Sequence, residues 1–343
     1  MQNFAPETLE IMKIRYSILW RVLHQQPVGR RQLGRQLGLS ERIVRRELEI
    51  LKARGFISWT PGGIYLCSTG EAILQDLDQF IPFLFDTRVL TEIMQKEFNL
   101  QEVLIVPGDS STNHLAKREM GRAAANYLQR NWFAGSVIAV SGGTTLAAMA
   151  DAICNNPRPI DIMAIPARGG LGEEMELQAG TIAATIARAV KGQYRLLHIP
   201  DYLEEETAHI LKEDVHIKKI VDTIRSCHIL VHGIGVAEEM AKRRGLSAGE
   251  IDFLHRQGAT GEALRYYFDN QGKIVYEVPG IGLELTDLAN VNIIVAVAGG
   301  SNKAEAIKAV LKSGYPKVLI TDEGAVKKII NGKGGKFDSK DSD

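Results

Sequence analysis

The sequence predicts two domains of α/β class: an N-terminal winged helix-turn-helix and a larger domain on a doubly wound, mostly parallel sheet. Three observations support this prediction. Near the N-terminus, helical stretches separated by a glycine turn precede a hairpin pattern. Beyond residue 90, apolar runs that end in glycine-rich turns alternate with helical stretches. Finally, basic side chains are concentrated at the N-terminal end. We expect domains at 1–88 and 89–332 and a disordered tail at 333–343.

The composition is that of a soluble globular protein, with 45% hydrophobic and 24% charged residues in a chain of 343. No apolar run is long enough to cross a membrane, and the acidic N-terminus lacks the features of a secretion signal. The three cysteines, Cys67, Cys154 and Cys227, are far apart. They form neither a metal cluster nor a redox pair, which favours a reducing cytoplasm.

The charge is unevenly distributed although its sum is zero. Residues 1–54 contain eleven Lys or Arg and five Asp or Glu, so the remainder carries the opposite excess. This asymmetry suggests that only the N-terminal domain meets a polyanion.

The first helices follow from the apolar spacing. Helices are predicted at 10–24 and 30–37, followed by a tight turn at Gly38-Leu39-Ser40 in which Ser40 caps a third helix. Gly55 ends that helix, and the segments 56–59 and 64–66 flank Thr60-Pro61-Gly62-Gly63 as a hairpin. This order is typical of a winged helix.

The third helix carries the DNA-binding prediction. One face has Arg42, Arg45, Arg46 and Glu49, and the opposite face has Val44, Leu48 and Leu51. Arginine suits guanine edges and phosphates, although a basic face can also be simply solvated. With the turn, cap and hairpin in order, DNA binding is the favoured interpretation. The predicted DNA-binding residues are Arg30, Arg31, Ser40, Arg42, Arg45 and Arg46.

A linker helix is predicted at 69–81, interrupted by Pro82, with a further helix at 89–98. Its excess apolar surface fits either pairing of subunits or packing against the second domain.

The larger domain shows seven predicted strands, at 103–106, 137–140, 160–165, 196–199, 229–232, 293–297 and 318–320. Ligands of such sheets bind at the carboxyl ends of the strands, where the glycine turns should gather. The turn Gly142-Gly143-Thr144-Thr145 joins a strand to a helix start. It fits a phosphate pocket, and it also fits ordinary turn and cap chemistry.

Other polar residues can converge at the same edge. Arg168, Arg243, Arg244 and Lys303 supply cations, and Glu262 and Gln178 could accept or donate bonds to sugar hydroxyls. Taken singly, each is better explained as a surface or capping residue than as a ligand contact. His228 and His232 share a strand face but have no third ligand at suitable spacing, so no metal site is predicted.

Several longer motifs resemble the SorC family of sugar-responsive transcriptional repressors over nearly the whole chain. They are Gly29-Arg30-Arg31, Ser40-Glu41-Arg42, MGRAAA at 120–125, GGTT at 142–145, PARGGLGE at 166–173, YRLL at 194–197, LVHGIG at 230–235, AVAGGSNKAEAI at 296–307 and TDEGA at 321–325. The resemblance implies an effector domain of the NagB/RpiA/CoA-transferase type. It further implies a repressor of a glycolytic (triose-phosphate and glyceraldehyde-3-phosphate dehydrogenase) operon, with fructose 1,6-bisphosphate as inducer.

By motif, the effector contacts would be Gly142, Gly143, Thr144, Thr145, Arg168, Gln178, Arg243, Arg244, Glu262 and Lys303. The resemblance implies operator DNA as partner and no cofactor besides the effector. We expect a homo-oligomer, a dimer or tetramer, on DNA. The main alternative is a sugar-phosphate isomerase or deaminase with an added DNA-binding module, with Glu262 or Asp322 as base. A structural DNA-associated protein with a vestigial sugar site is a third interpretation.

Overall fold

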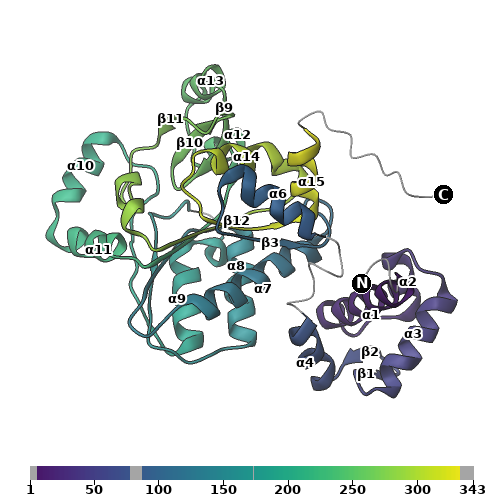
Figure 1. Cartoon of the computed structure of the whole chain (residues 1–343). Coiled ribbons are helices and arrows are strands. Elements are labelled where there is room, and N and C mark those ends of the chain that lie inside the picture. The colour runs from purple at the N-terminus through teal and green to yellow at the C-terminus, as the bar shows by residue number, and fades with distance from the viewer. Residues whose placement is uncertain (1–5, 78–86, 173, 333–343) are drawn as a thin grey trace. The chain divides into compact units, whose positions relative to one another are not determined.

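The computed structural model describes residues 6–77, 87–172 and 174–332 (Figure 1). The chain folds into two compact units, Met1–Val89 and Leu90–Asp343, which meet one residue from the predicted boundary at 88. The predicted tail at 333–343, the end of the predicted linker helix at 78–81 and Pro82 lie outside the described residues.

The N-terminal unit is a winged helix. Its elements are α1 (Pro6–Gln25), α2 (Arg30–Leu37), α3 (Glu41–Ala53), β1 (Ile57–Thr60), β2 (Gly63–Leu66) and α4 (Ser68–Leu77). Gly38 ends α2 at φ 64°, a backbone conformation that glycine adopts at no steric cost, and Ser40 caps α3 by accepting from the Ile43 amide. Val44, Leu48 and Leu51 of α3 are buried in the core of this unit. The helix start, the turn and the hairpin therefore confirm the predicted winged helix.

The larger unit is built on a seven-stranded parallel sheet. Its strands, in spatial order, are β3 (Glu102–Val106), β13 (Val318–Asp322), β12 (Ile293–Val297), β7 (Ile229–His232), β4 (Val137–Val140), β5 (Met163–Pro166) and β6 (Gln193–Tyr194). The doubly wound parallel sheet is thus confirmed.

Helices cover both faces of this sheet. They are α6 (Arg88–Phe98), α7 (His114–Asn131), α8 (Thr144–Asn155), α9 (Ala179–Val190), α10 (Glu205–Glu213), α11 (Val215–Arg225), α14 (Ala304–Lys312) and α15 (Glu323–Asn331). Two further helices, α12 (Ala237–Arg243) and α13 (Ala248–Arg256), pack instead against a second, smaller sheet. Along β4, Ile138 and Val140 join the core of α7, α8 and α9, whereas Ala139 joins the core of α14 and α15. Figure 1 shows α7, α8 and α9 together on one side of the sheet. Met94 and Phe98 of α6 are buried in the core of this unit.

Two features of the larger unit differ from the prediction. The segment 196–199 is not a strand: Leu197 and Ile199 pack against the core from a loop, and the edge strand β6 lies just before it. A second, four-stranded antiparallel sheet was missed; its order is β11 (Ile274–Glu277), β10 (Tyr266–Asp269), β9 (Ala259–Ala263) and β8 (Gly235–Val236). This small sheet matters because β9 carries Glu262.

Candidate functional site

A cavity of about 300 Å³ opens where strands of the parallel sheet end. Its walls come from the loops that follow β3, β4, β5, β7 and β12, together with α12 and β9. The glycine-rich turns therefore gather at one edge of the sheet, as expected for a doubly wound fold.

The Gly142–Thr145 turn forms the start of α8 at the cavity wall. Gly143 is the N-cap at φ 119°, and α8 has no side-chain cap, so its first-turn amides keep their capacity to bind an anion. Gly142 packs on the backbone, because a Cβ there would lie 2.6 Å from the Leu177 carbonyl oxygen. Ser141 is used internally: its hydroxyl accepts from the Gly233 amide at 3.1 Å and joins the β4 and β7 loops.

Three cations converge on one end of this cavity. Lys303 lies at the end of the short 3-10 helix Ser301–Lys303, and Lys117 and Arg243 also line the cavity. Burial lowers the pKa of Lys303, and the nearby charges of Lys117 and Arg243 lower it further, against the opposing effect of Glu239 and Glu262. A bound phosphate would offset this repulsion and favour the charged lysine.

Eight of the predicted effector residues line this cavity: Gly142, Gly143, Thr144, Thr145, Arg168, Arg243, Glu262 and Lys303. Gln178 lies in a small adjoining pocket that it shares with Gly142 and Arg168. Arg244 lines neither, so the structure does not place it where it would contact a ligand directly.

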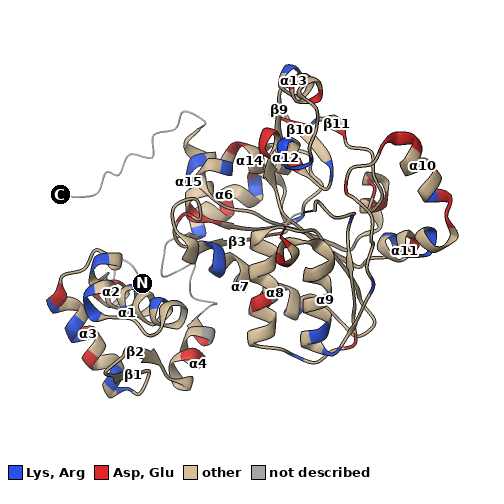
Figure 2. Ribbon diagram, turned by 180° about the vertical axis from the view of Figure 1, so that it is seen from behind, with Lys and Arg blue, Asp and Glu red and all other residues tan. Residues whose placement is uncertain are grey.

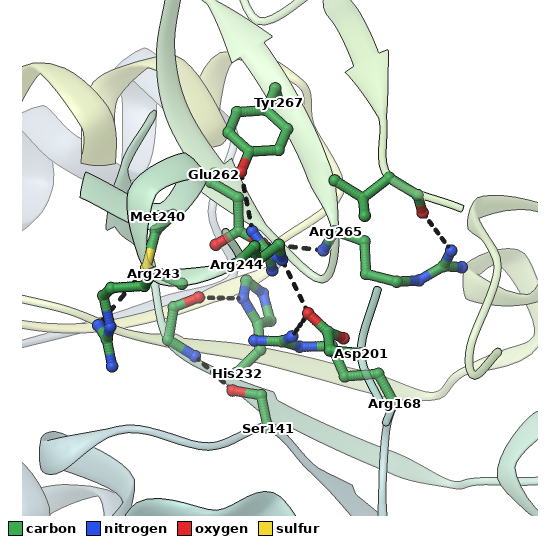
Figure 3. A network of polar contacts seen from close by, with 12 residues as sticks. Ser141, Arg168, Asp201, His232, Met240, Arg243, Arg244, Glu262, Arg265 and Tyr267 are labelled. Atoms are coloured by element: carbon green, nitrogen blue, oxygen red, sulfur yellow. Dashed lines mark hydrogen bonds and ion pairs between the residues drawn. The ribbon is translucent and has the colours of Figure 1, made fainter. Parts of the chain in front are cut away.

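Arg244 is instead the centre of a buried ionic network (Figure 3). Its Nε donates to Asp201 at 2.7 Å, its Nη2 to Glu262 at 2.6 Å and its Nη1 to the Tyr267 hydroxyl at 3.1 Å. Burial acts to lower the pKa of Arg244, but Glu262 and Asp201 outweigh burial and raise it. The neighbouring Arg243 points away from this network toward Met240, because successive helical residues are about 100° apart.

The sequence allowed Glu262 to cap a helix, but in the structure it lies in a strand and caps none of the described helices. It is 3% exposed in β9, and its Oε1 accepts from Arg244 and from the Arg265 amide at 2.8 Å.

The two histidines have separate structural partners. The Nδ1 of His228 accepts from the Val137 amide at 3.0 Å, and the Nδ1 of His232 lies 2.9 Å from the Gly233 carbonyl oxygen. Burial lowers the pKa of His232 and keeps its ring neutral. Within residues 6–77, 87–172 and 174–332, no group of three or more His, Cys, Asp or Glu side chains is placed to hold a metal ion.

Asp322, considered as a catalytic base, has a structural role. It is 0% exposed and accepts from three backbone amides, those of Ser110, Gly300 and Ala325. Its carboxylate therefore fixes the loops after β3 and β12. Because it already accepts these three hydrogen bonds, it is not placed to act as a base on a ligand.

Sequence reasoning missed a part of the cavity wall that is formed by Ser110, Ser111, His114, Lys117 and Asn302. The loop after β3 is held by Asp109, whose Oδ1 accepts from Ser111 and from the Ser301 amide at 3.1 Å. Burial acts to raise the pKa of Asp109, but these hydrogen bonds outweigh it and lower it to about 2. The turn Pro107-Gly108-Asp109-Ser110 was the available signal.

The candidate nucleic-acid interface is the outer face of α3 (Figure 2). Arg42, Arg45 and Arg46 are exposed on it, and Arg30 of α2 is bonded to Glu41 at 2.9 Å. Arg45 pairs with Glu49 at 3.0 Å, so on DNA a phosphate or base would take the place of that carboxylate. Among the described residues, Arg31 and Arg42 have no ion-pair partner.

Two features of this unit were not predicted. Glu47, on the buried side of α3, binds Arg15 of α1 at 2.7 Å and Arg46 at 2.8 Å. The ammonium of Lys52, at the end of α3, lies 4.7 Å from the ring centroid of Trp59 on the wing.

Comparisons with known proteins identify both units. A model of the CggR N-terminal DNA binding domain matches residues 11–81, and a model of a sugar-binding domain matches residues 84–331. The central glycolytic genes regulator of Priestia megaterium is 40% identical over 96% of each chain. The chain belongs to the central glycolytic genes regulator family. The regulator of that name in Bacillus subtilis is 37% identical over 96% of this chain and 97% of its own length.

Solved structures of SorC-type regulators share the fold of this family member. A SorC family transcriptional regulator from Enterococcus faecalis is 36% identical, with a TM-score of 0.65 over 71% of this chain and 100% of its own. The full-length sorbitol operon regulator SorC from Klebsiella pneumoniae, 18% identical, matches the fold with a TM-score of 0.67 over 92% of this chain and 97% of its own.

The comparisons confirm a DNA-binding transcriptional regulator with a sugar-binding domain, as the motifs had indicated. The alternative of an isomerase or deaminase is not supported, because the relatives are regulators. No helix of the described residues is long and apolar enough to span a membrane.

Proposed function

We propose that this regulator represses a glycolytic operon that encodes the triose-phosphate steps, and that fructose 1,6-bisphosphate relieves the repression. The names of its relatives, central glycolytic genes regulators, support the first part. The second part rests on the motif resemblance and on the chemistry of the cavity. No cofactor is invoked, since the sugar phosphate acts as a ligand only.

The observation that carries the proposal is the cationic end of the cavity beside an uncapped helix start. The same cavity is lined by the N-terminus of α8 and by the cations Lys117, Arg243 and Lys303. Their positive charges complement the negative charge of a phosphate. Arg168, on the loop after β5, gives a second phosphate a cation, and Glu262 can accept from hydroxyls between them. A bisphosphorylated sugar can bind the cationic end of the cavity with one phosphate, Arg168 with the other and Glu262 with a hydroxyl.

The regulatory step is a change in operator affinity. A ligand shifts DNA binding only as far as it distinguishes two states of the protein, and such coupling is typically about 1–3 kcal/mol. We propose that the protein acts in the cytoplasm as a homo-oligomer, a dimer or tetramer, because dimeric helix-turn-helix proteins read two half-sites.

The test is a fluorescence anisotropy titration of labelled operator DNA at fixed salt, with and without fructose 1,6-bisphosphate. We expect the sugar to weaken binding of the wild-type protein by about 5- to 100-fold. Lys303→Ala should bind DNA normally and lose this response, and Arg45→Ala should bind DNA weakly with an unchanged sugar affinity. Equal operator affinity at zero and saturating sugar would refute the proposal.

A further inference from the structure

Asp201 lies behind the cavity wall and joins Arg168, which lines the cavity, to Arg244, which does not. It is 1% exposed; its Oδ2 accepts from Arg244 at 2.7 Å and forms an ion pair with Arg168. Arg168 lines the cavity, and its buried Nε has no hydrogen-bond acceptor among the described residues. An unmet guanidinium N–H is costly when buried, so Arg168 retains the capacity to bind a further anion.

Arg244 fixes the other end of the same network. All three of its guanidinium nitrogens donate hydrogen bonds. The Oε1 of Glu262 accepts both from the Nη2 of Arg244 and from the Arg265 amide. Because Oε1 is held by two donors, Oε2 is the oxygen of Glu262 that remains for a ligand. Among the described residues, that Oε2 has no hydrogen-bond partner.

The charges in this network balance before any ligand binds. Arg168 and Arg244 carry two positive charges, and Asp201 and Glu262 carry two negative ones. A phosphate that approaches Arg168 must therefore share that guanidinium with Asp201, in surroundings where charges are poorly solvated.

We infer that Asp201 and Arg244 are positioning residues that make the site selective for a phosphorylated sugar over inorganic phosphate. Asp201 competes with the phosphate for Arg168, which weakens binding of a bare anion. Arg244 holds Glu262 so that Oε2 faces the hydroxyls that only a sugar supplies. The inference rests on the proposed effector function and adds the origin of its selectivity.

The test measures calorimetric affinities of the full-length protein for inorganic phosphate and for fructose 1,6-bisphosphate. Asp201→Asn removes the competing charge and should tighten inorganic phosphate by about threefold or more. Arg244→Lys should weaken the bisphosphate by about tenfold while inorganic phosphate changes by less than about twofold. Arg225→Lys, at an exposed ion pair with Glu284, is the matched control and should change neither affinity.

A double-mutant cycle separates positioning from general loss of structure. In the Glu262→Gln background, Arg244→Lys should cause no further loss of bisphosphate affinity, since Arg244 acts through Glu262. The same tenfold loss in both backgrounds would overturn the inference, as would inorganic phosphate binding no tighter to Asp201→Asn. Should Asp201→Asn fail to fold by thermal melting, the cycle alone decides.

The two proposals fail in different ways. If the wild-type protein does not bind fructose 1,6-bisphosphate, the proposed effector is wrong, whereas the phosphate titration of Asp201→Asn still tests the competition for Arg168.

Discussion

Glu47 is an acidic residue on a helix whose exposed face is basic. It is 1% exposed and bonded to Arg15 and Arg46, so it ties α1 to α3 and holds one of the candidate DNA-contacting arginines. Burial acts to raise the pKa of Glu47, but its bonds to Arg15 and Arg46 outweigh burial and lower it. This residue therefore contributes to the stability of the DNA-binding unit and orients one of its exposed arginines.

We predict that Glu47→Gln lowers the free energy of unfolding of the N-terminal unit by about 1–3 kcal/mol, because two arginines lose their charged partner. A carboxyl whose folded pKa is lowered stabilises above its unfolded pKa, and that stability is lost as pH falls through the folded pKa. Urea unfolding between pH 7 and acidic pH should therefore show a step in the wild type that the variant lacks. Glu49→Gln, whose parent side chain is exposed, is the control and should change stability little.

Lys303 gives the effector site a pH dependence. Because burial, Lys117 and Arg243 lower its pKa, Lys303 loses its proton at a lower pH than an ordinary lysine. The affinity for fructose 1,6-bisphosphate should be full below that pKa and fall as pH rises through it. Lys303→Arg keeps the charge and should flatten this part of the calorimetric pH profile. Lys308→Arg is the control, because Lys308 lies on the adjoining helix α14 and is paired with Glu305. This variant should retain the wild-type pH profile.

At the scale of elements, the sequence predicted what local patterns determine. The strand–turn–helix units were predictable because buried parallel strands are continuous apolar runs and end in glycine turns. The small antiparallel sheet could not be predicted, because β9 has the sequence Ala-Thr-Gly-Glu-Ala, which is a poor strand pattern. Its Gly261 is needed for close packing on the backbone of Ala306. Arg243 lines the cavity whereas Arg244 binds Glu262, and this difference depends on the missed sheet because its strand β9 supplies Glu262.

The β4–α8 turn provides a prediction at this scale. A Cβ at Gly142 would lie 2.6 Å from the Leu177 carbonyl oxygen, to which the Gly143 amide donates at 2.9 Å. Gly142→Ala must therefore displace the turn from the segment before α9. We expect stability to fall by about 1–3 kcal/mol and phosphate affinity to fall with it. Gly249→Ala, where a Cβ meets open space, is the control and should leave both nearly unchanged in denaturation and calorimetry.

The whole molecule separates its charges between two units with separate cores. Residues 1–54 hold eleven basic and five acidic side chains, and the complete chain has zero net charge. Only the basic end attracts a polyanion, while the acidic remainder disfavours contact with DNA outside the winged helix. Since the cores of the two units share no residues, substitutions in one should leave the intrinsic binding chemistry of the other unchanged.

Arg42→Ala tests this separation. Arg42 is exposed at the start of α3, and removal of a phosphate-neutralising charge should reduce the slope of log affinity against log salt by about 1. Operator affinity should fall, while the calorimetric affinity for fructose 1,6-bisphosphate without DNA should match the wild type. Arg225→Ala, an exposed arginine of the larger unit, should leave the slope unchanged. A normal slope in Arg42→Ala would mean that α3 does not present this side chain to the DNA backbone.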